Sequence, residues 1–442
     1  MISQKLCSVS SVVLILAVST WNAQADTLSQ VASQVLKTHP RLRAAASSAR
    51  SVQYEIQQAE AGNSPKFGLI ADPGRSYNRA RREWNSAGDF GVRGTYLLYD
   101  GGRTDNEIER QRARFLSATE RSKLTEDQLV GQVADAYIEV LKQDRLEQLA
   151  KANVEAHLDL YNKTQEIVTL DKGRGYDLTQ ARARLQQAQV TLTSRRGALD
   201  EARALLADIA GYKPATLLLP VDPSKAIPAT QAAAVDQLEI HPAFKAAQAE
   251  ILSARRAADI AAAWYRPRVD LQGTINSPQD FQGDRDYLKG YDVRFAVQWN
   301  PFDGGGGRAG SRAAAEQLNA AKDNADSVRR DLSNDVTRSW AQIETRRGRT
   351  GAWDTLVQQN IKVRDVYWQQ FRIGRRSMLD LLNAENELFQ TRSSAETDRM
   401  ELLQAQYRLL TSLAQLNSWL GVVRSPDAVT IDGRSPQQPQ SK

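Results

Sequence analysis

Hydrophobic residues recur at two different spacings along the chain. Through very long stretches they step by three and four positions, which is the spacing of one face of a helix. Between about residues 104 and 170 there is no proline and one glycine, so a helix of roughly 100 Å is expected at about 1.5 Å per residue. A second such stretch covers about residues 308 to 373, with the apolar series Leu318, Ala321, Ala325, Val328, Leu332, Val336, Trp340 and Ile343. The pattern predicts coiled-coil packing of long helices.

Four shorter segments alternate apolar and polar residues with a period of two, which is typical of strands. They cover about residues 65–71, 90–99, 268–276 and 292–299. In the second of them Val92, Tyr96 and Leu98 fall on one face, and Arg93 and Thr95 on the other. Residues 72–89 are rich in Asp, Pro, Gly, Asn and Arg and are expected to form a loop. This loop carries Arg75, Arg79, Arg81 and Arg82, and the resemblance described below implies that it faces outward.

The chain contains an internal repeat with a period of about 200 residues, recognised by the order of its rare features. His39-Pro40 corresponds to His241-Pro242 at an offset of 202, and Asp177-Leu178 corresponds to Asp380-Leu381 at an offset of 203. The Asp-Gly-Gly elements also lie 203 residues apart, at Asp100, Gly101 and Gly102 and at Asp303, Gly304 and Gly305. Each such element is expected to turn a strand into a helix, with the aspartate as N-cap.

The repeat predicts the domain organisation. A first repeat of helix, strand, strand and helical hairpin covers residues 26–211, with its hairpin at about 104–211. A proline-rich linker at 212–234 leads to a second repeat at 235–421, with its hairpin at about 308–421. Pro, Gln and Ser dominate residues 422–442, so a disordered tail is expected there. The fold class is mainly α, with a contribution from a membrane β-barrel.

The membrane interpretation of the strands depends on their exposed backbone. A small sheet inside a soluble domain is the simplest alternative, but no other β-rich segment is present for such a sheet to pack against. In lipid, an open sheet edge costs several kcal/mol for each unpaired backbone group. Four strands cannot close a barrel, since known barrels begin at about 8 strands. A barrel therefore requires several chains.

Residues 1–25 are predicted to be a signal peptide. Lys5 precedes an apolar run from Val12 to Val18, and Ala23-Gln24-Ala25 is a small-x-small cleavage site. A retained membrane anchor is the alternative, but the run is much shorter than the roughly 18 to 20 residues that a spanning helix needs. Cys7, the only cysteine, would leave with this segment. Disulfides, cysteine metal sites and thiol catalysis are then excluded.

Charge and composition narrow the function classes. The 58 basic and 52 acidic residues are interspersed along the predicted helices, which indicates solvated helix faces and no nucleic-acid partner. There are three histidines and no clustered metal ligands, nucleophile elbow or cofactor motif, so neither an enzyme nor a bound cofactor is expected. The four glycines at 304–307 are not followed by the Lys-Ser/Thr of a phosphate loop.

With these features the chain resembles the TolC-like outer-membrane factors over nearly its whole length after residue 25. The string from Phe371 to Ala384, FRIGRRSMLDLLNA, and the two Asp-Gly-Gly junctions are the most specific parts. The resemblance implies a homotrimer in the outer-membrane lipid of a Gram-negative bacterium, where three sets of four strands form a 12-stranded barrel. It further implies a long periplasmic tunnel, a periplasmic adaptor (membrane fusion) protein and an inner-membrane pump.

The resemblance also assigns roles at the helical turns. Asp177 would pair with Arg376 to hold neighbouring helices in a closed periplasmic gate, and Asp380 would supply one carboxylate per chain to a ring at the constriction. Such carboxylates would raise one another's pKa. Phe371 stands where many relatives have tyrosine. Adaptor hairpins are expected to dock at the turns, on Lys172, Arg174, Gly374 and Arg375. Ordinary helix capping by Asp177 and Ser377 is an alternative that is compatible with gating.

The expected function is the exit duct of a type I secretion system with an ABC-type pump. The basis is that the compact Gly-Arg-Gly-Tyr-Asp turn at 173–177 and the Asp-Gly-Gly junctions resemble those of the family members that serve type I secretion. The alternative within the transport class is the outer-membrane component of a drug efflux pump. A more distant alternative is a soluble periplasmic coiled-coil scaffold.

Overall fold

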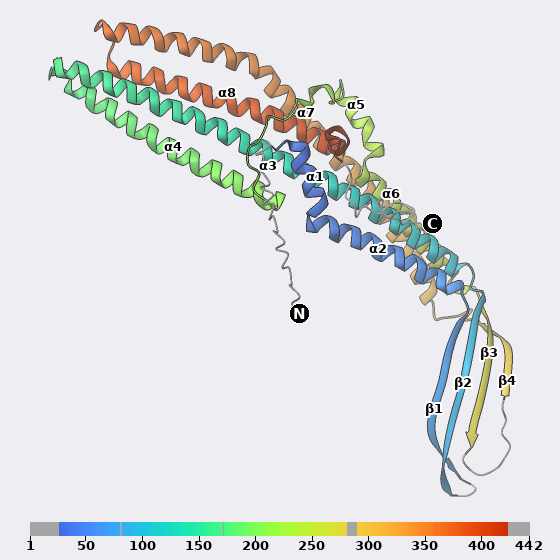
Figure 1. Ribbon diagram of the computed structural model, residues 1–442. Helices are drawn as coiled ribbons and strands as arrows, with labels where there is room; N and C mark the ends of the chain where they lie inside the picture. The colour runs from blue at the N-terminus through green and yellow to red at the C-terminus, as the bar shows by residue number, and fades with distance from the viewer. Residues whose placement is uncertain (1–25, 80–81, 171, 281–289, 423–442) are drawn as a thin grey trace, which may run out of the picture.

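The computed structural model describes residues 26–79, 82–170, 172–280 and 290–422. Two helices run almost the full length of the helical part, α3 (Arg103–Leu170) and α7 (Gly306–Arg372). Each returns as a shorter helix, α4 (Gly175–Ala210) after α3 and α8 (Met378–Ser412) after α7. Figure 1 shows the two hairpins side by side, with their turns at one end of the molecule and the four strands at the other.

The remaining helices occupy the middle and the half nearer the sheet. The first repeat begins with α1 (Leu28–Thr38) and α2 (Pro40–Glu60), which are separated at the His39-Pro40 pair. The second begins with α5 (Gln231–Asp236) and α6 (Pro242–Ala262), again with a His-Pro pair at the start of the long member. A short α9 (Leu416–Leu420) follows α8. The predicted fold class, long packed helices with four strands, is confirmed.

The four strands form one antiparallel sheet in chain order, β1 (Lys66–Asn78), β2 (Glu83–Tyr99), β3 (Arg268–Asp280) and β4 (Gly290–Gln298). The register aligns Leu69, Val92, Ile275 and Tyr291 in one row across all four strands. This face is exposed and apolar, with Leu69 and Tyr291 each 86% exposed. Residues on the opposite face include Arg93, Thr274 and Asp292. The face assignment made from the period-two pattern is therefore correct.

The strands extend further than the sequence predicted. The segment expected to be a loop from residue 72 to 89 is mostly paired backbone, since Asp72 lies opposite Asp89 and Tyr77 lies opposite Trp84. Residues of low strand propensity are held there because the hydrogen-bond ladder of the hairpin continues past the apolar part. The predicted signal peptide and residues 423–442 of the predicted tail lie outside the described residues.

The main hydrophobic core lies in the middle of the molecule. There α1 packs against α3, and the ends of α4 and α8 close over them. The Tyr137 hydroxyl lies 2.7 Å from the carbonyl oxygens of Asp26 and Leu218, and the Tyr407 hydroxyl donates to the Val221 carbonyl at 2.9 Å. These bonds attach the proline-rich segment after α4 to the two hairpins at mid-height.

Candidate functional site

The turns of the two hairpins carry most of the residues that the sequence singled out. A short 3-10 turn, Lys172–Arg174, connects α3 to α4. Between α7 and α8, Gly374 takes the left-handed conformation with φ of 72°, which costs a glycine little. Ser377 then caps α8, because the Asp380 amide donates to its hydroxyl at 3.1 Å and the Ser377 amide donates to the Asp380 carboxylate at 3.4 Å. This reciprocal box begins the helix directly after the turn.

The residues predicted to form the gate have their partners within their own hairpins. Asp177 accepts from Arg174 Nε at 3.0 Å. Arg376 lies with its guanidinium carbon 4.4 Å from the ring centre of Tyr367, and its Nη1 lies 3.8 Å from Asp380 Oδ2. Within one chain Asp177 and Arg376 do not pair with each other. A pairing between neighbouring chains stays a prediction.

Asp380 is stabilised in its charged form by its own turn. The hydrogen bond from the Ser377 hydroxyl, together with Arg376, lowers the pKa of this carboxyl below its ordinary value. Hydrogen bonds to the ionised form act in this direction. A rise in pKa through neighbouring copies, as the predicted carboxylate ring implies, would have to overcome this local stabilisation.

Cations covering aromatic rings join the two hairpins near the tip. Lys163 Nζ lies 4.7 Å from the ring centre of Trp368, and the guanidinium carbon of Arg174 lies 4.8 Å from that of Phe371. Both cations belong to the first hairpin and both rings to α7. We call these four residues the tip clasp. Such contacts contribute about 0.5 to 2 kcal/mol each, more when desolvated.

Phe371 is the most buried member of the tip clasp, at 1% exposed. It stacks on Trp368 and packs on a buried apolar cluster formed by Leu160, Ala181, Met378, Leu381 and Leu382. The sequence reasoning named Phe371 and Arg174 but missed Lys163, Trp368 and the pairing. The available signal was three aromatic residues, Tyr367, Trp368 and Phe371, within the last turns before Gly374.

The residues expected to dock an adaptor differ in their exposure to solvent. Lys172, Gly374 and Arg375 are exposed at the apex, whereas Arg174 is half-buried in the tip clasp. The apex also exposes three large apolar side chains that the sequence reasoning missed: Leu170, Tyr176 and Ile373. The turn surface is therefore basic and apolar together.

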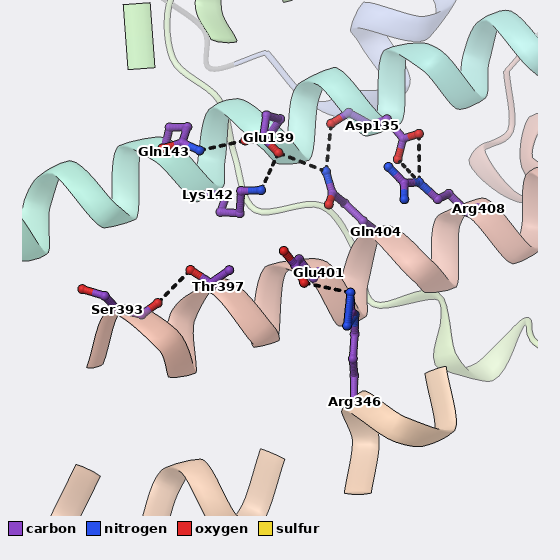
Figure 2. A network of polar contacts seen from close by, with 10 residues as sticks. All are labelled: Asp135, Glu139, Lys142, Gln143, Arg346, Ser393, Thr397, Glu401, Gln404 and Arg408. Atoms are coloured by element: carbon purple, nitrogen blue, oxygen red, sulfur yellow. Dashed lines mark hydrogen bonds and ion pairs between the residues drawn. The ribbon is translucent and has the colours of Figure 1, made fainter. Parts of the chain in front are cut away.

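A polar network links three helices at mid-height, as Figure 2 shows. Arg408 Nε on α8 donates to both carboxylate oxygens of Asp135 on α3, at 2.9 and 3.1 Å. Gln404 donates to the Asp135 carbonyl at 3.3 Å, and Arg346 on α7 binds Glu401 on α8 at 2.8 Å. Burial raises the pKa of Asp135 although Arg408 opposes the shift. The network fixes α8 between the two long helices.

The strand-to-helix junctions are built around the two aspartates. Asp100 is buried and accepts from the amides of Gly102, Arg103 and Thr104 at 2.8 to 3.0 Å. Asp303 accepts from the amides of Gly305 and Gly307. Arg103 also donates to the carbonyls of Ala263 and Trp264, so the first junction is attached to the end of α6.

In the described part of the chain, no group of three or more His, Cys, Asp and Glu side chains is placed to hold a metal ion. None of the helices described has both the length and the apolar character needed to cross a membrane.

Comparisons with known proteins agree with this architecture. A family model described as outer membrane efflux protein matches residues 31–212 and 234–422. The chain is 21% identical over 350 residues to the outer membrane efflux protein BepC of Brucella suis biovar 1 (strain 1330), which covers 78% of this chain and 76% of BepC.

Two solved structures share the fold. CusC matches with a TM-score of 0.80 at 18% identity, covering 88% of this chain and 92% of the CusC chain. The outer membrane protein VceC of Vibrio cholerae matches with a TM-score of 0.76 at 18% identity, covering 88% of this chain and 96% of VceC. At these identities the structures indicate likeness of fold alone.

Proposed function

The chain belongs to the outer membrane efflux protein family, and from this premise we propose that three copies close one channel through the outer membrane. The observation that carries the proposal is the pair of free sheet edges. Among the described residues, strands β1 and β4 each pair with one neighbour only, and an unpaired backbone group in lipid costs several kcal/mol. Three copies of four strands would give a closed ring of 12.

The internal repeat indicates where the copies meet. Within the chain, α3 packs on α6, and Glu250 accepts from Ser117 at 2.8 Å and pairs with Arg121 at 3.4 Å. Adding the offset of 203 to Ser117 and Arg121 gives Ala320 and Asn324 on α7, and subtracting 202 from Glu250 gives Ser48 on α2. These three residues are exposed in the single chain. We therefore expect α7 of one copy to pack on α2 of the next.

The same two offsets also relate two close contacts within the chain, so the repeat extends to tertiary contacts. Gly62, at the end of the α2 segment, lies against Thr104, since a Cβ added there would meet Thr104 Cγ2 at 2.8 Å. The corresponding contact in the second half pairs Trp264 with Gly307, whose added Cβ would meet the indole ring at 2.2 Å. In the first half the larger side chain, Thr104, follows the strands, and in the second half the larger side chain, Trp264, precedes them. The close contact itself is present in both halves.

Cysteine cross-linking tests the ring. Ser48→Cys combined with Asn324→Cys should give covalent dimers and trimers when a short bifunctional maleimide is added to isolated membranes. Arg121→Cys combined with Glu250→Cys, the corresponding pair within one chain, is the matched control and should give monomers only. A monomer pattern for both pairs, with the protein extracted by salt alone, would contradict the channel and favour the soluble scaffold.

For the cargo, we propose protein secretion through a type I system with a periplasmic adaptor and an ABC-type pump. The turn between α3, which ends at Leu170, and α4, which begins at Gly175, is compact. It supports the proposal because it resembles the turn of the family members that serve type I secretion. Small-molecule efflux is the second candidate, favoured by the family description and by the name of BepC. Deleting the gene separates the two: the proposal requires loss of a secreted protein at unchanged drug susceptibility, and the reverse pattern would support small-molecule efflux.

A further inference from the structure

The β1–β2 hairpin points away from the helices (Figure 1), and a cluster of three arginines belongs to its far end. Arg75 belongs to β1, and Arg79 and Arg82 belong to the turn; all three side chains are exposed. No ion pair among the described side chains includes any of them. Because the helical part lies in the periplasm, this end of the hairpin faces the outside of the cell.

Arg75 lies on the lipid side of the sheet. Side chains two residues apart share a face of a strand, so Arg75 shares the face of Phe67 and Leu69, which are 80% and 86% exposed. Asp72, the nearest described carboxylate along β1, falls on the opposite face. The positive charge of Arg75 is therefore presented toward the membrane.

The height of Arg79 and Arg82 matches the phosphate level of a bilayer. Tyr77 and Trp84 lie opposite each other with ring centres 5.4 Å apart, on the same face of the hairpin as Tyr96. Trp84 and Tyr96 are 12 positions apart in β2, which corresponds to about 40 Å at about 3.3 Å per residue. A strand tilt of about 40° reduces this to a height of roughly 30 Å, which suits two aromatic girdles around an apolar band about 25 Å tall. Arg79 and Arg82 then lie directly beyond the outer girdle.

We propose that Arg75, Arg79 and Arg82 bind the phosphate groups of an outer-leaflet glycolipid of the lipid A class. A guanidinium donates two parallel hydrogen bonds to a phosphate, which makes arginine well suited to this group. The apolar face below the cluster would contact the acyl chains of the same lipid. A ligand anchored in the bilayer is favoured over a soluble anion because the arginines and the apolar residues occupy one continuous face.

The test uses the full-length channel in detergent micelles, with diphosphoryl lipid A as the probe and native mass spectrometry to count bound lipid. Replacing all three arginines by glutamine (R75Q, R79Q and R82Q together) should weaken lipid A binding tenfold or more, since each cation near a membrane surface contributes about fivefold. A variant with Lys151→Gln, Lys213→Gln and Lys225→Gln removes the same charge from exposed positions of the periplasmic part and should bind as the unchanged protein does.

Three outcomes would overturn the proposal. The first is equal binding by the arginine variant and the unchanged protein. The second is equal binding of a phosphate-free glycolipid, and the third is displacement of lipid A by inorganic phosphate at low millimolar concentration, which would indicate a site for soluble anions. A non-boiled gel of each variant shows whether it keeps the assembly of the unchanged protein, so a folding failure is distinguished from a binding loss.

Discussion

The guanidinium carbon of Arg174 lies 4.8 Å from the ring centre of Phe371, so a residue of the first hairpin covers a buried ring of the second. Arg174 also donates to Asp177 at 3.0 Å. One arginine thereby connects the predicted gate residue Asp177 to the aromatic residues of α7. This connection within the chain supports the tip as the place where the two hairpins are held together.

Phe371→Leu should loosen the tip. The substitution keeps an apolar side chain in a buried site but removes the ring under Arg174 and the stacking on Trp368, a loss of about 1 to 2 kcal/mol per chain. We expect higher single-channel conductance in planar bilayers. Tyr161→Leu is the matched control, because it removes the ring under Arg182 within the first hairpin only. Unchanged conductance in Phe371→Leu would show that the tip clasp does not hold the hairpins.

Asp177→Asn and Arg376→Gln distinguish two models of the predicted gate. If Asp177 binds Arg376 of a neighbouring chain, the conductance change of the double variant should equal that of either single variant, because both remove one interaction. If Asp177 acts through Arg174 of its own chain, the two changes should add. Surface pairs contribute about 0 to 1 kcal/mol each, so the effect depends on three copies acting together. No change in either single variant would exclude both models.

Gly131→Ala should destabilise the middle of the molecule although alanine favours helices by about 1 kcal/mol over glycine. A Cβ at this position of α3 would meet Thr411 Cγ2 at 2.6 Å and Thr411 Oγ1 at 2.8 Å. Thr411→Ala should restore the stability of Gly131→Ala, because it removes the colliding atoms. Thermal unfolding followed by circular dichroism measures both variants. A melting temperature of Gly131→Ala at or above that of the unchanged protein would refute the close packing of α3 on α8.

His241 predicts an acid-sensitive step in stability. Its Nδ1 accepts from the Ala243 amide at 3.1 Å, which caps α6, and burial lowers its pKa from 6.5 to about 4. Only the form without a proton on Nδ1 can accept this bond. The unfolded chain takes up the proton first, so stability is present above about pH 6.5 and declines as pH falls toward about 4, by on the order of 3 kcal/mol at most.

His241→Asn keeps a capping acceptor but does not titrate. Between pH 7 and pH 4.5 its melting temperature should fall less steeply than that of the unchanged protein. Some acid sensitivity should remain, since burial also lowers the pKa of His157 on α3 to about 4. Identical slopes for the two proteins would show that the His241 cap makes no contribution to the acid sensitivity.

The sequence by itself determined the elements and their order. Spacings of three and four for the helices, and of two for the strands, depend on neighbours along the chain, and so does the cap at Ser377. The offset of about 203 residues was likewise readable as a repetition of such local signals. For each of these local signals, the physical cause lies within a few residues of the position concerned.

The tertiary structure alone decided which residues meet. Strand β1 continues to Asn78 and strand β2 begins at Glu83, because each strand supplies backbone hydrogen bonds to the other where strand propensity is poor. Lys163 of the first hairpin reaches Trp368 of the second, which lies 205 positions further along the chain. Contacts of this kind depend on how helices are placed in space, and no spacing along the chain records that placement.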